Sequence, residues 1–262
     1  MSEPTSPPTS RRDFLKTSAA VAGATLASGL AAPHVHAAGS DVLKVGLVGC
    51  GGRGTGAAMQ ALRADKNTRL VALGDAFSDR LEECRKHLAG LEDIGSRVAV
   101  DPDHRFTGFS AYKSVIENVD VVLLATPPGF RPIHLQAAID AGRHVFCEKP
   151  MAVDGPGVKK VLDAAAEARK KNLSLVSGFC WRRHPIMRET MKRVHDGALG
   201  YILTMQCNYN TGPLWVRKRQ PGMSDMEYQM RNWYYYAWLS GDFNVEQHIH
   251  SLDKAAWAMK DV

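Results

Sequence analysis

The segment G-C-G-G-R-G at residues 49–54 constrains the fold of this chain more than any other feature, because of its neighbours. The apolar run at residues 44–48 is typical of a buried strand, and residues 56–63 have the composition of a helix. Between a strand and a helix, the first glycine makes the tight turn, the second lets the backbone approach a pyrophosphate, and the third lets the helix pack closely. The helix N-terminus then meets the phosphate charge. We therefore expect cofactor contacts from Gly49, Gly51, Gly52, Arg53 and Gly54.

Strand-like and helix-like segments continue to alternate after this turn. A glycine-rich turn by itself does not predict such an alternation. The apolar strand candidates lie at residues 69–74, 119–125, 144–147 and 173–177, and the helix candidates lie at residues 79–88, 114–117, 132–141 and 156–171. Residues 90–108 are rich in Gly, Pro, Asp and Ser, and we expect an irregular surface excursion there. The strand candidates are continuous apolar runs, as in parallel strands covered on both faces. The pattern predicts an α/β fold, with a doubly wound Rossmann domain over residues 41–178.

The pattern changes after residue 178. A helix expected at residues 185–195 precedes a longer, partly alternating strand candidate at residues 201–209. Aromatic residues then gather in the remaining sequence, namely Trp215, Trp233, Tyr234, Tyr235, Tyr236 and Trp238. Residues 179–262 are therefore expected to begin a second region of different architecture. A single long strand cannot form a stable sheet by itself.

The N-terminal 40 residues are expected to lie outside this fold. Residues 10–16 read S-R-R-D-F-L-K, followed by a weakly apolar run at residues 18–32 and a possible cleavage site at residues 35–37. The segment resembles a twin-arginine export signal, and the apolar run is too short and glycine-rich for a comfortable membrane span. We expect a signal peptide at residues 1–37, location in the periplasm or cell envelope, and no stable membrane insertion. The resemblance implies export of the folded protein, with its cofactor loaded in the cytoplasm.

Charge and cysteine content exclude other classes of protein. The net charge of +6 is modest, and the short basic clusters are too scattered to form a nucleic-acid-binding stripe. The five cysteines are widely separated, with neither a C-x-x-C pair nor zinc-ligand spacing to histidines. We therefore expect no nucleic-acid partner and no structural metal.

The acidic residue required by a dinucleotide site is Asp75. It follows the strand expected at residues 69–74 and lies 21 positions after Gly54. Its carboxylate would accept hydrogen bonds from the ribose hydroxyls and would repel a 2′-phosphate, at a cost on the order of several kcal/mol. The spacing favours NAD over NADP; the alternative is an ordinary turn aspartate.

Two further strand ends meet at the expected ligand-binding edge of the sheet. Thr126 and Pro127 follow one strand, and His134 lies in the next helix, where a structural role and a cofactor contact are equally open. The E-K-P tripeptide at residues 148–150 ends the following strand. Lys149 at the mouth of a nicotinamide crevice can polarise a hydroxyl or carbonyl during proton transfer, while a solvent lysine is the alternative.

Glu246, His250 and Asp253 form a possible catalytic group near the end of the chain. Their i, i+4 and i+7 spacing puts all three on one face of a helix, where a histidine can act as general base beside an orienting carboxylate. A solvated ion-pair stripe is the alternative interpretation of such a face.

Together, the glycine turn, Asp75, the 126–127 rim, the E-K-P tripeptide and the late acid-x-x-x-His-x-x-Asp pattern resemble the Gfo/Idh/MocA family of glucose–fructose oxidoreductase and inositol 2-dehydrogenase. The resemblance implies hydride transfer between a sugar or polyol carbon and nicotinamide. It puts Lys149 and His250 at the reacting oxygen and Glu246 in an orienting role. It also implies cofactor contacts from Thr126, Pro127, His134 and Glu148.

The resemblance also carries expectations about substrate and assembly. Arg182, Arg183 and Tyr209 follow the last Rossmann strand, and we therefore expect them to contact a substrate. Asp253 is a further candidate for such a contact. Family members complete an open antiparallel sheet, commonly used for pairing, so the full-length form is expected to be a homo-oligomer and this chain a truncated copy. Glu246 stands where the family usually has aspartate, which shifts the carboxylate by roughly 1 Å, a displacement that can matter in catalysis.

Three functions remain open on the sequence. The first is an exported NAD-dependent sugar or polyol dehydrogenase. The second is a glycosidase resembling the NAD-dependent α-N-acetylgalactosaminidases, which would use the same residues on a glycoside. The third is a nucleotide-binding chain without turnover.

Overall fold

The computed structural model describes residues 41–260. The predicted signal peptide at residues 1–37 lies outside the described residues. The boundary predicted near residue 178 stays a prediction.

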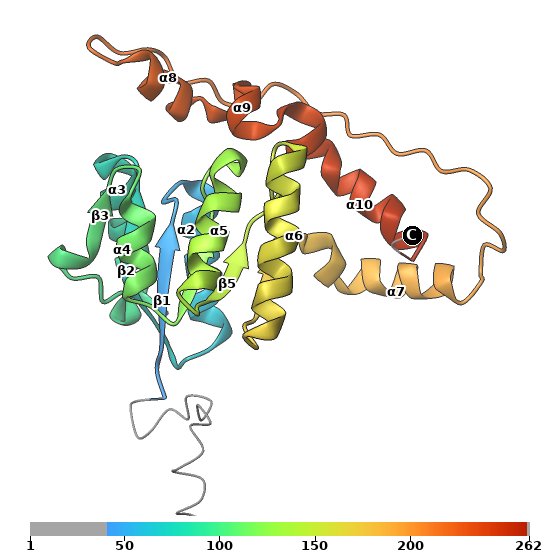
Figure 1. Cartoon of the computed structure of the whole chain (residues 1–262), viewed down its shortest axis with the longest axis horizontal. Helices are drawn as coiled ribbons and strands as arrows, with labels where there is room; N and C mark the ends of the chain where they lie inside the picture. Colours follow the sequence, from blue (N-terminus) through green and yellow to red (C-terminus); the bar gives the residue numbers. More distant parts are fainter. Residues whose placement is uncertain (1–40, 261–262) are drawn as a thin grey trace, which may run out of the picture. The chain divides into compact units, whose positions relative to one another are not determined.

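Six parallel strands form one sheet in the order β3-β2-β1-β4-β5-β6 (Figure 1). In chain order they are β1 (Leu43–Val48), β2 (Thr68–Asp75), β3 (Arg105–Thr107), β4 (Val121–Leu124), β5 (His144–Cys147) and β6 (Leu175–Ser177). The order runs outward from β1 in both directions, and every pairing is parallel. The predicted doubly wound α/β fold is confirmed, and its ligand crevice is expected at the carboxyl ends of β1 and β4, where the strand order reverses.

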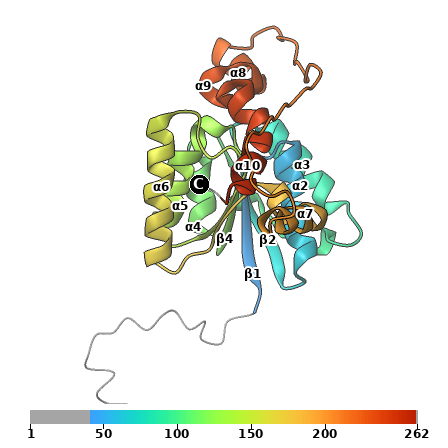
Figure 2. The same cartoon turned by 90° about the vertical axis from the view of Figure 1, so that its right-hand side faces the viewer.

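Helices cover both faces of the sheet. On one face lie α2 (Gly52–Ala64) and α3 (Ser78–Ala89), and on the other lie α4 (Ala111–Glu117), α5 (Arg131–Asp140) and α6 (Gly155–Lys170) (Figure 2). Successive residues of one strand serve the two cores: Leu123 packs with α2 and α3, while Val122 and Leu124 pack with α4 and α5. This double burial explains why the strands read as continuous apolar runs.

The irregular excursion predicted at residues 90–108 is wrong at its end, because β3 forms there. Arg105–Thr107 pairs with the carboxyl end of β2 and makes the edge of the sheet. A three-residue edge strand with one polar side chain at each end has no apolar run to reveal it. The remaining residues of the excursion include two short 3-10 turns, at Gly95–Arg97 and Pro102–His104.

The second half of the described chain is helical and extended. Its helices are α7 (Pro185–His195), α8 (Asp225–Arg231), α9 (Ala237–Ser240) and α10 (Ile249–Ala258), and a π-helix at Asn244–His248 leads into α10. Short 3-10 turns lie at Pro128–Phe130, Cys180–Arg183 and Trp233–Tyr235. Figure 2 shows α8 and α9 beyond the carboxyl edge of the sheet.

The strand predicted at residues 201–209 is wrong, and no antiparallel sheet forms within residues 41–260. These residues are neither strand nor helix, and the side chains of Tyr201 and Leu203 are almost fully exposed. The segment has the composition of a strand, but a strand needs a partner for its backbone hydrogen bonds, and none lies beside it in the described part of the chain.

Candidate active site

A cavity of about 350 Å³ lies at the carboxyl edge of the sheet. Its wall includes the glycine turn after β1, Asp75 at the end of β2, and Thr126 and Pro127 after β4. These are the ends of the three adjacent central strands, so the cavity occupies the crevice expected of an open α/β sheet. We refer to it as the nucleotide cavity.

Two glycines fix the shape of the turn. Gly49 has φ +96°, and a Cβ there would lie 2.7 Å from the carbonyl carbon of Ala125 and the nitrogen of Thr126. A Cβ on Gly54 would lie 1.8 Å from the carbonyl oxygen of Gly49. Both positions therefore exclude any side chain, the first through conformation and contact and the second through the close approach of α2 to β1.

The same turn leaves room for a ligand. Nothing lies within 4 Å of the place a Cβ would occupy on Gly51 or Gly52. Helix α2 begins at Gly52 with neither a side-chain cap nor an acidic residue in its first turn, so its first N–H groups face the cavity without a carboxylate. Such a helix N-terminus suits a pyrophosphate, and the residues present therefore fit a dinucleotide.

Asp75 is held at the cavity wall by two backbone hydrogen bonds. Its Oδ2 accepts from the Cys50 N–H at 2.7 Å and its Oδ1 accepts from the Phe77 N–H at 2.9 Å. Burial raises the pKa of the Asp75 carboxyl, and the two backbone donors oppose that rise. The carboxylate is therefore oriented before any ligand arrives, and one of its donors belongs to the glycine turn itself.

Arg53 lines the cavity, and Glu148 binds Arg53 from outside the cavity wall. Glu148 is 4% exposed and does not line the cavity. Its Oε1 accepts a hydrogen bond from Arg53 Nε at 2.6 Å, and its Oε2 accepts one from the Lys149 N–H at 3.1 Å. Gly178 leaves space for this carboxylate, because a Cβ there would lie 2.6 Å from Oε2. The predicted cofactor contact from Glu148 therefore has the geometry of a support for Arg53 and for the backbone of Lys149.

His134 is a buried residue of the cavity wall. Its Nδ1 lies 3.3 Å from Thr126 Oγ1, and its ring stacks on Tyr112 with a centroid separation of 4.2 Å. Burial, followed by the charge of Arg131, lowers the pKa of His134 to about 4. The imidazole is therefore neutral at physiological pH and holds the rim threonine.

Arg131 contacts both the segment after β4 and the segment after β5, a role that no sequence motif indicated. It is buried and donates to the carbonyl oxygen of Thr126 at 2.7 Å and to that of Pro150. Its carbonyl partners come from the ends of β4 and β5, and only the tertiary fold brings them to one guanidinium. Arg131 therefore positions both predicted rims.

Lys149 and Glu246 meet across the boundary between the two halves of the chain. Lys149 Nζ donates to Glu246 Oε1 at 2.8 Å and to the Glu246 carbonyl oxygen at 2.5 Å. Both side chains are largely buried, with 13% and 9% exposed. The π-helix at Asn244–His248 presents both the carboxylate and the carbonyl of Glu246 to the same ammonium group.

His250 lies one turn further, in α10. Burial, followed by the charges of Lys149 and Lys254, lowers the pKa of His250 to about 4. Its Nδ1 and the Oε2 of Glu246 are buried and have no hydrogen-bond partner within residues 41–260. Two unpaired buried acceptor positions beside a lysine ammonium are suited to receive the hydroxyl groups of a ligand.

The four predicted substrate residues have different surroundings. Asp253 accepts from Arg182 Nε at 2.9 and 3.1 Å, so these two residues bind each other. The Tyr209 ring lies against His250 with a centroid separation of 6.3 Å, whereas Arg183 is exposed. Only Tyr209 and the Arg182–Asp253 pair are thus associated with α10, and their roles toward a substrate stay predictions.

Sequence reasoning missed the residues that the aromatic second half contributes to the nucleotide cavity. They are Trp215, Arg217, Met230, Arg231 and Trp233. The aromatic run was visible in the sequence, but nothing in its spacing indicated which strand ends it would cover. Within residues 41–260 no group of three or more His, Cys, Asp or Glu side chains could hold a metal ion, and no helix is long and apolar enough to cross a membrane.

Comparison with known proteins bears on both the fold and the leader. Residues 43–176 match the Gfo/Idh/MocA oxidoreductase family, described by its NAD-binding Rossmann fold. Residues 8–28 match a twin-arginine translocation pathway signal sequence, which confirms the predicted export signal.

Individual relatives align with the chain over different lengths. It is 36% identical over 167 residues to inositol 2-dehydrogenase 4 of Saccharopolyspora erythraea, covering 63% of this chain and 44% of that protein. It is 28% identical over 225 residues to a glycosyl hydrolase family 109 protein of Shewanella amazonensis, covering 79% and 47%. The chain thus spans about half the length of these relatives.

Among solved structures, the aldose-aldose oxidoreductase from Caulobacter crescentus complexed with glycerol superposes with a TM-score of 0.57 at 24% identity, covering 84% of this chain and 58% of that one. At this identity the likeness supports the fold alone. The family match, in contrast, runs from β1 into β6 and includes the glycine turn, Asp75 and the E-K-P tripeptide. The chain belongs to the Gfo/Idh/MocA family of NAD-binding oxidoreductases.

Proposed function

We propose that the protein is an exported oxidoreductase that transfers a hydride between a hydroxyl-bearing carbon of a sugar or polyol and the nicotinamide of a bound dinucleotide. The observation that carries this proposal is the buried group of Lys149, Glu246 and His250. It combines a cation, a neutral imidazole and two unpaired acceptor atoms at the carboxyl edge that also holds the nucleotide cavity.

Each of these residues has a chemical task in such a reaction. When bound, the nicotinamide supplies the hydride acceptor. His250, neutral above a pKa of about 4, takes the proton from the substrate hydroxyl. Lys149 donates a hydrogen bond to the oxygen as it becomes a carbonyl, and Glu246 holds the ammonium of Lys149 in place.

The cofactor proposed is NAD rather than NADP. Asp75 lines the cavity at the end of β2, with both carboxylate oxygens oriented by backbone donors. A carboxylate in this position accepts hydrogen bonds from ribose hydroxyls and repels a 2′-phosphate. Substitution of Asp75 by Ser should therefore narrow the preference for NAD over NADP, measured as the ratio of the two dissociation constants.

The substrate class proposed is a sugar or polyol, as the name of the inositol 2-dehydrogenase relative suggests. The test is incubation of the full-length protein with NAD and a panel of free polyols, aldoses and glycosides. Accumulation of NADH with a free sugar or polyol supports the proposal. Release of sugar from a glycoside without net NADH would contradict it.

That contrary outcome is the second candidate function, an NAD-dependent glycosidase. It is favoured by the glycosyl hydrolase family 109 relative, whose alignment covers 79% of this chain. Both reactions would use the same buried lysine and histidine, so product analysis, rather than mutation of these residues, separates them.

We also propose that the full-length form is a homo-oligomer, on the strength of the family resemblance. Light scattering coupled to size-exclusion chromatography tests the proposal, and a monomeric mass over the accessible concentration range would contradict it.

A further inference from the structure

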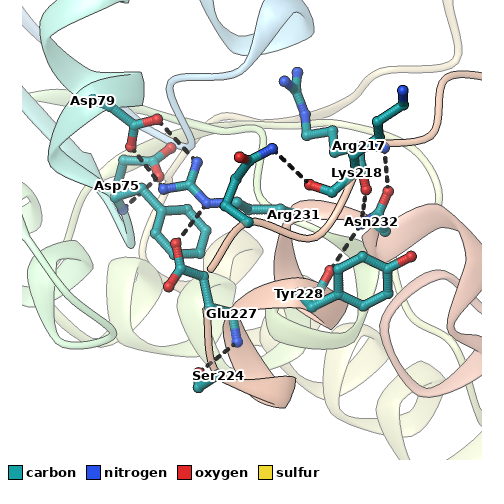
Figure 3. A network of polar contacts seen from close by, with 11 residues as sticks. Asp75, Asp79, Arg217, Lys218, Ser224, Glu227, Tyr228, Arg231 and Asn232 are labelled. Atoms are coloured by element: carbon teal, nitrogen blue, oxygen red, sulfur yellow. Dashed lines mark hydrogen bonds and ion pairs between the residues drawn. The ribbon is translucent and has the colours of Figure 1, made fainter. Parts of the chain in front are cut away.

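Residues 215–233 cover one end of the nucleotide cavity, and we call this segment the clasp. It contributes Trp215, Arg217, Arg231 and Trp233 to the cavity wall. The two tryptophan rings lie 6.2 Å apart between centroids and give this wall an apolar surface beside its arginines. The clasp belongs to the second half of the chain, yet it lines the same cavity as Asp75, and Figure 3 shows Arg231 near Asp79 and Asp75.

Arg231 fastens the clasp to the Rossmann half. Its guanidinium donates to the two oxygens of Asp79 at 2.9 and 3.1 Å, and it lies 4.1 Å above the centroid of the Phe77 ring. Its Nε donates to Glu227 Oε1 at 2.8 Å within α8. A two-bond arginine–carboxylate pair with an aromatic platform is a directional attachment, and Figure 3 shows it beside Asp75.

Asn232 fixes the backbone of Arg217. This asparagine is 2% exposed; its Oδ1 accepts from the Arg217 N–H at 2.7 Å, and its Nδ2 donates to the Arg217 carbonyl at 3.1 Å. Nδ2 also donates to the Tyr228 carbonyl at 3.0 Å. The buried Asn232 side chain thus forms hydrogen bonds with both the N–H and the carbonyl of Arg217, as the backbone of a neighbouring strand would. These two bonds hold the Arg217 backbone at the cavity.

Arg217 has no carboxylate partner within residues 41–260, although acidic groups hold its neighbours. Arg231 pairs with Asp79 and Glu227, and Arg80 pairs with Glu83 at 3.3 Å. Desolvation, followed by the charges of Arg80 and Arg231, lowers the pKa of Arg217. Three guanidinium groups therefore converge at one end of a cavity, and one of them has no ion-pair partner among the described residues.

We propose that Arg217 binds a phosphate group of the dinucleotide, and that the Arg231–Asp79 pair is the latch that holds the clasp over the nucleotide. The inference rests on the proposed function for the identity of the ligand. Unpaired guanidinium groups in fixed positions are the side chains best suited to phosphate oxygens. The shared chemistry is a phosphate, carried either in the pyrophosphate of NAD or additionally on the 2′-oxygen of NADP.

Binding measurements test the role of Arg217. The full chain and its Arg217→Ala variant are titrated with NAD, NADP, ADP and adenosine by calorimetry. Loss of a charge-assisted hydrogen bond is expected to weaken NAD and ADP binding by roughly tenfold to a hundredfold and to leave adenosine binding unchanged. An additional loss for NADP would identify the 2′-phosphate as a second contact of this arginine.

Arg219→Ala is the matched control for this titration. Arg219 is on the same segment but pairs with Asp225 and lies outside the cavity wall. Unchanged binding of NAD and ADP by Arg217→Ala, or an equal loss in both variants, would overturn the role of Arg217.

The latch is tested by release kinetics and by proteolysis. Asp79→Ala and Arg231→Ala are each expected to release NADH about tenfold faster in stopped-flow fluorescence, and the charge-exchanged double variant Asp79→Arg/Arg231→Asp is expected to recover part of the loss. Trypsin cuts after Arg217, Lys218 and Arg219, so the same variants are expected to be cleaved there faster even without ligand. Release and cleavage rates equal to wild type would overturn the latch.

These outcomes also separate the inference from the proposed function. A protein that binds ADP through Arg217, but neither NAD nor NADP, would overturn the dinucleotide oxidoreductase and retain the phosphate contact. A protein that binds NAD tightly, with no effect of Arg217 or Arg231, would retain the oxidoreductase and overturn the clasp.

Discussion

At the scale of single residues, the site depends on buried polar groups held by specific neighbours. Lys149 is held by Glu246, whereas His250 and His134 are kept neutral. The resemblance to the Gfo/Idh/MocA family predicted Lys149, Glu246 and His250 as a set, whereas spacing alone left other interpretations open for each of them. Arg131 and Arg217 could not be predicted, since no sequence motif includes them and their hydrogen-bond partners are set by the tertiary fold.

Lys149→Met is expected to lower turnover of the full-length enzyme by about a hundredfold or more, because it removes the donor to the reacting oxygen while keeping most of the length of the side chain. NAD binding should change little, since Lys149 does not line the nucleotide cavity. Single-turnover NADH formation and calorimetry measure the two effects. Lys159→Met, which removes an exposed ion pair with Asp163, is the control. A large loss of NAD binding with normal turnover would contradict the assigned role.

The buried imidazole of His134 predicts how stability depends on pH. Its pKa is about 4 in the folded chain and about 6.5 when unfolded, so the unfolded chain binds more protons between these values. The free energy of unfolding is therefore expected to fall as pH drops from 6.5 toward 4. His134→Gln should flatten this slope, as measured by urea unfolding at a series of pH values. An unchanged slope would show that His134 titrates normally.

At the scale of elements, the sequence predicted well wherever an apolar run is buried on both faces. The strands β1, β2, β4 and β5 and the helix α7 lie close to their predicted positions. It failed at β3, which is too short to carry a pattern, and at residues 201–209, where strand composition has no pairing partner within the described residues. Local composition reveals which backbone is suited to a sheet, while the availability of a neighbouring strand is a property of the whole fold.

The packing of α2 on β1 gives a prediction at this scale. Gly54→Ala would place a Cβ 1.8 Å from the Gly49 carbonyl oxygen, which forces the helix away from the strand. Unfolding free energy is expected to fall by about 2 kcal/mol or more, given the usual cost of overpacking. Gly52→Ala is the matched control in the same turn, because nothing lies within 4 Å of its Cβ position. Equal losses in denaturant titrations would contradict this account of the turn.

At the scale of the whole molecule, the leader decides where the folded protein works. Residues 8–28 match a twin-arginine signal sequence, which supports export by that pathway. Exchange of Arg11 and Arg12 for lysine is expected to retain the protein in the cytoplasm, as judged by fractionation and immunoblotting. The same exchange at Arg188 and Arg193 on α7 should leave export intact. Normal export of the first variant would contradict the assignment of the signal.

The two halves of the described chain are joined by polar contacts at two distant points, Arg231 with Asp79 and Lys149 with Glu246. Arg231 lines the nucleotide cavity, whereas Lys149 and Glu246 do not. The Asp79 carboxylate is 61% exposed, whereas both side chains of the Lys149–Glu246 pair are largely buried, so the Arg231–Asp79 pair is the weaker attachment. A cofactor exchange that opens the clasp at Asp79 therefore requires no change in the Lys149–Glu246 pair.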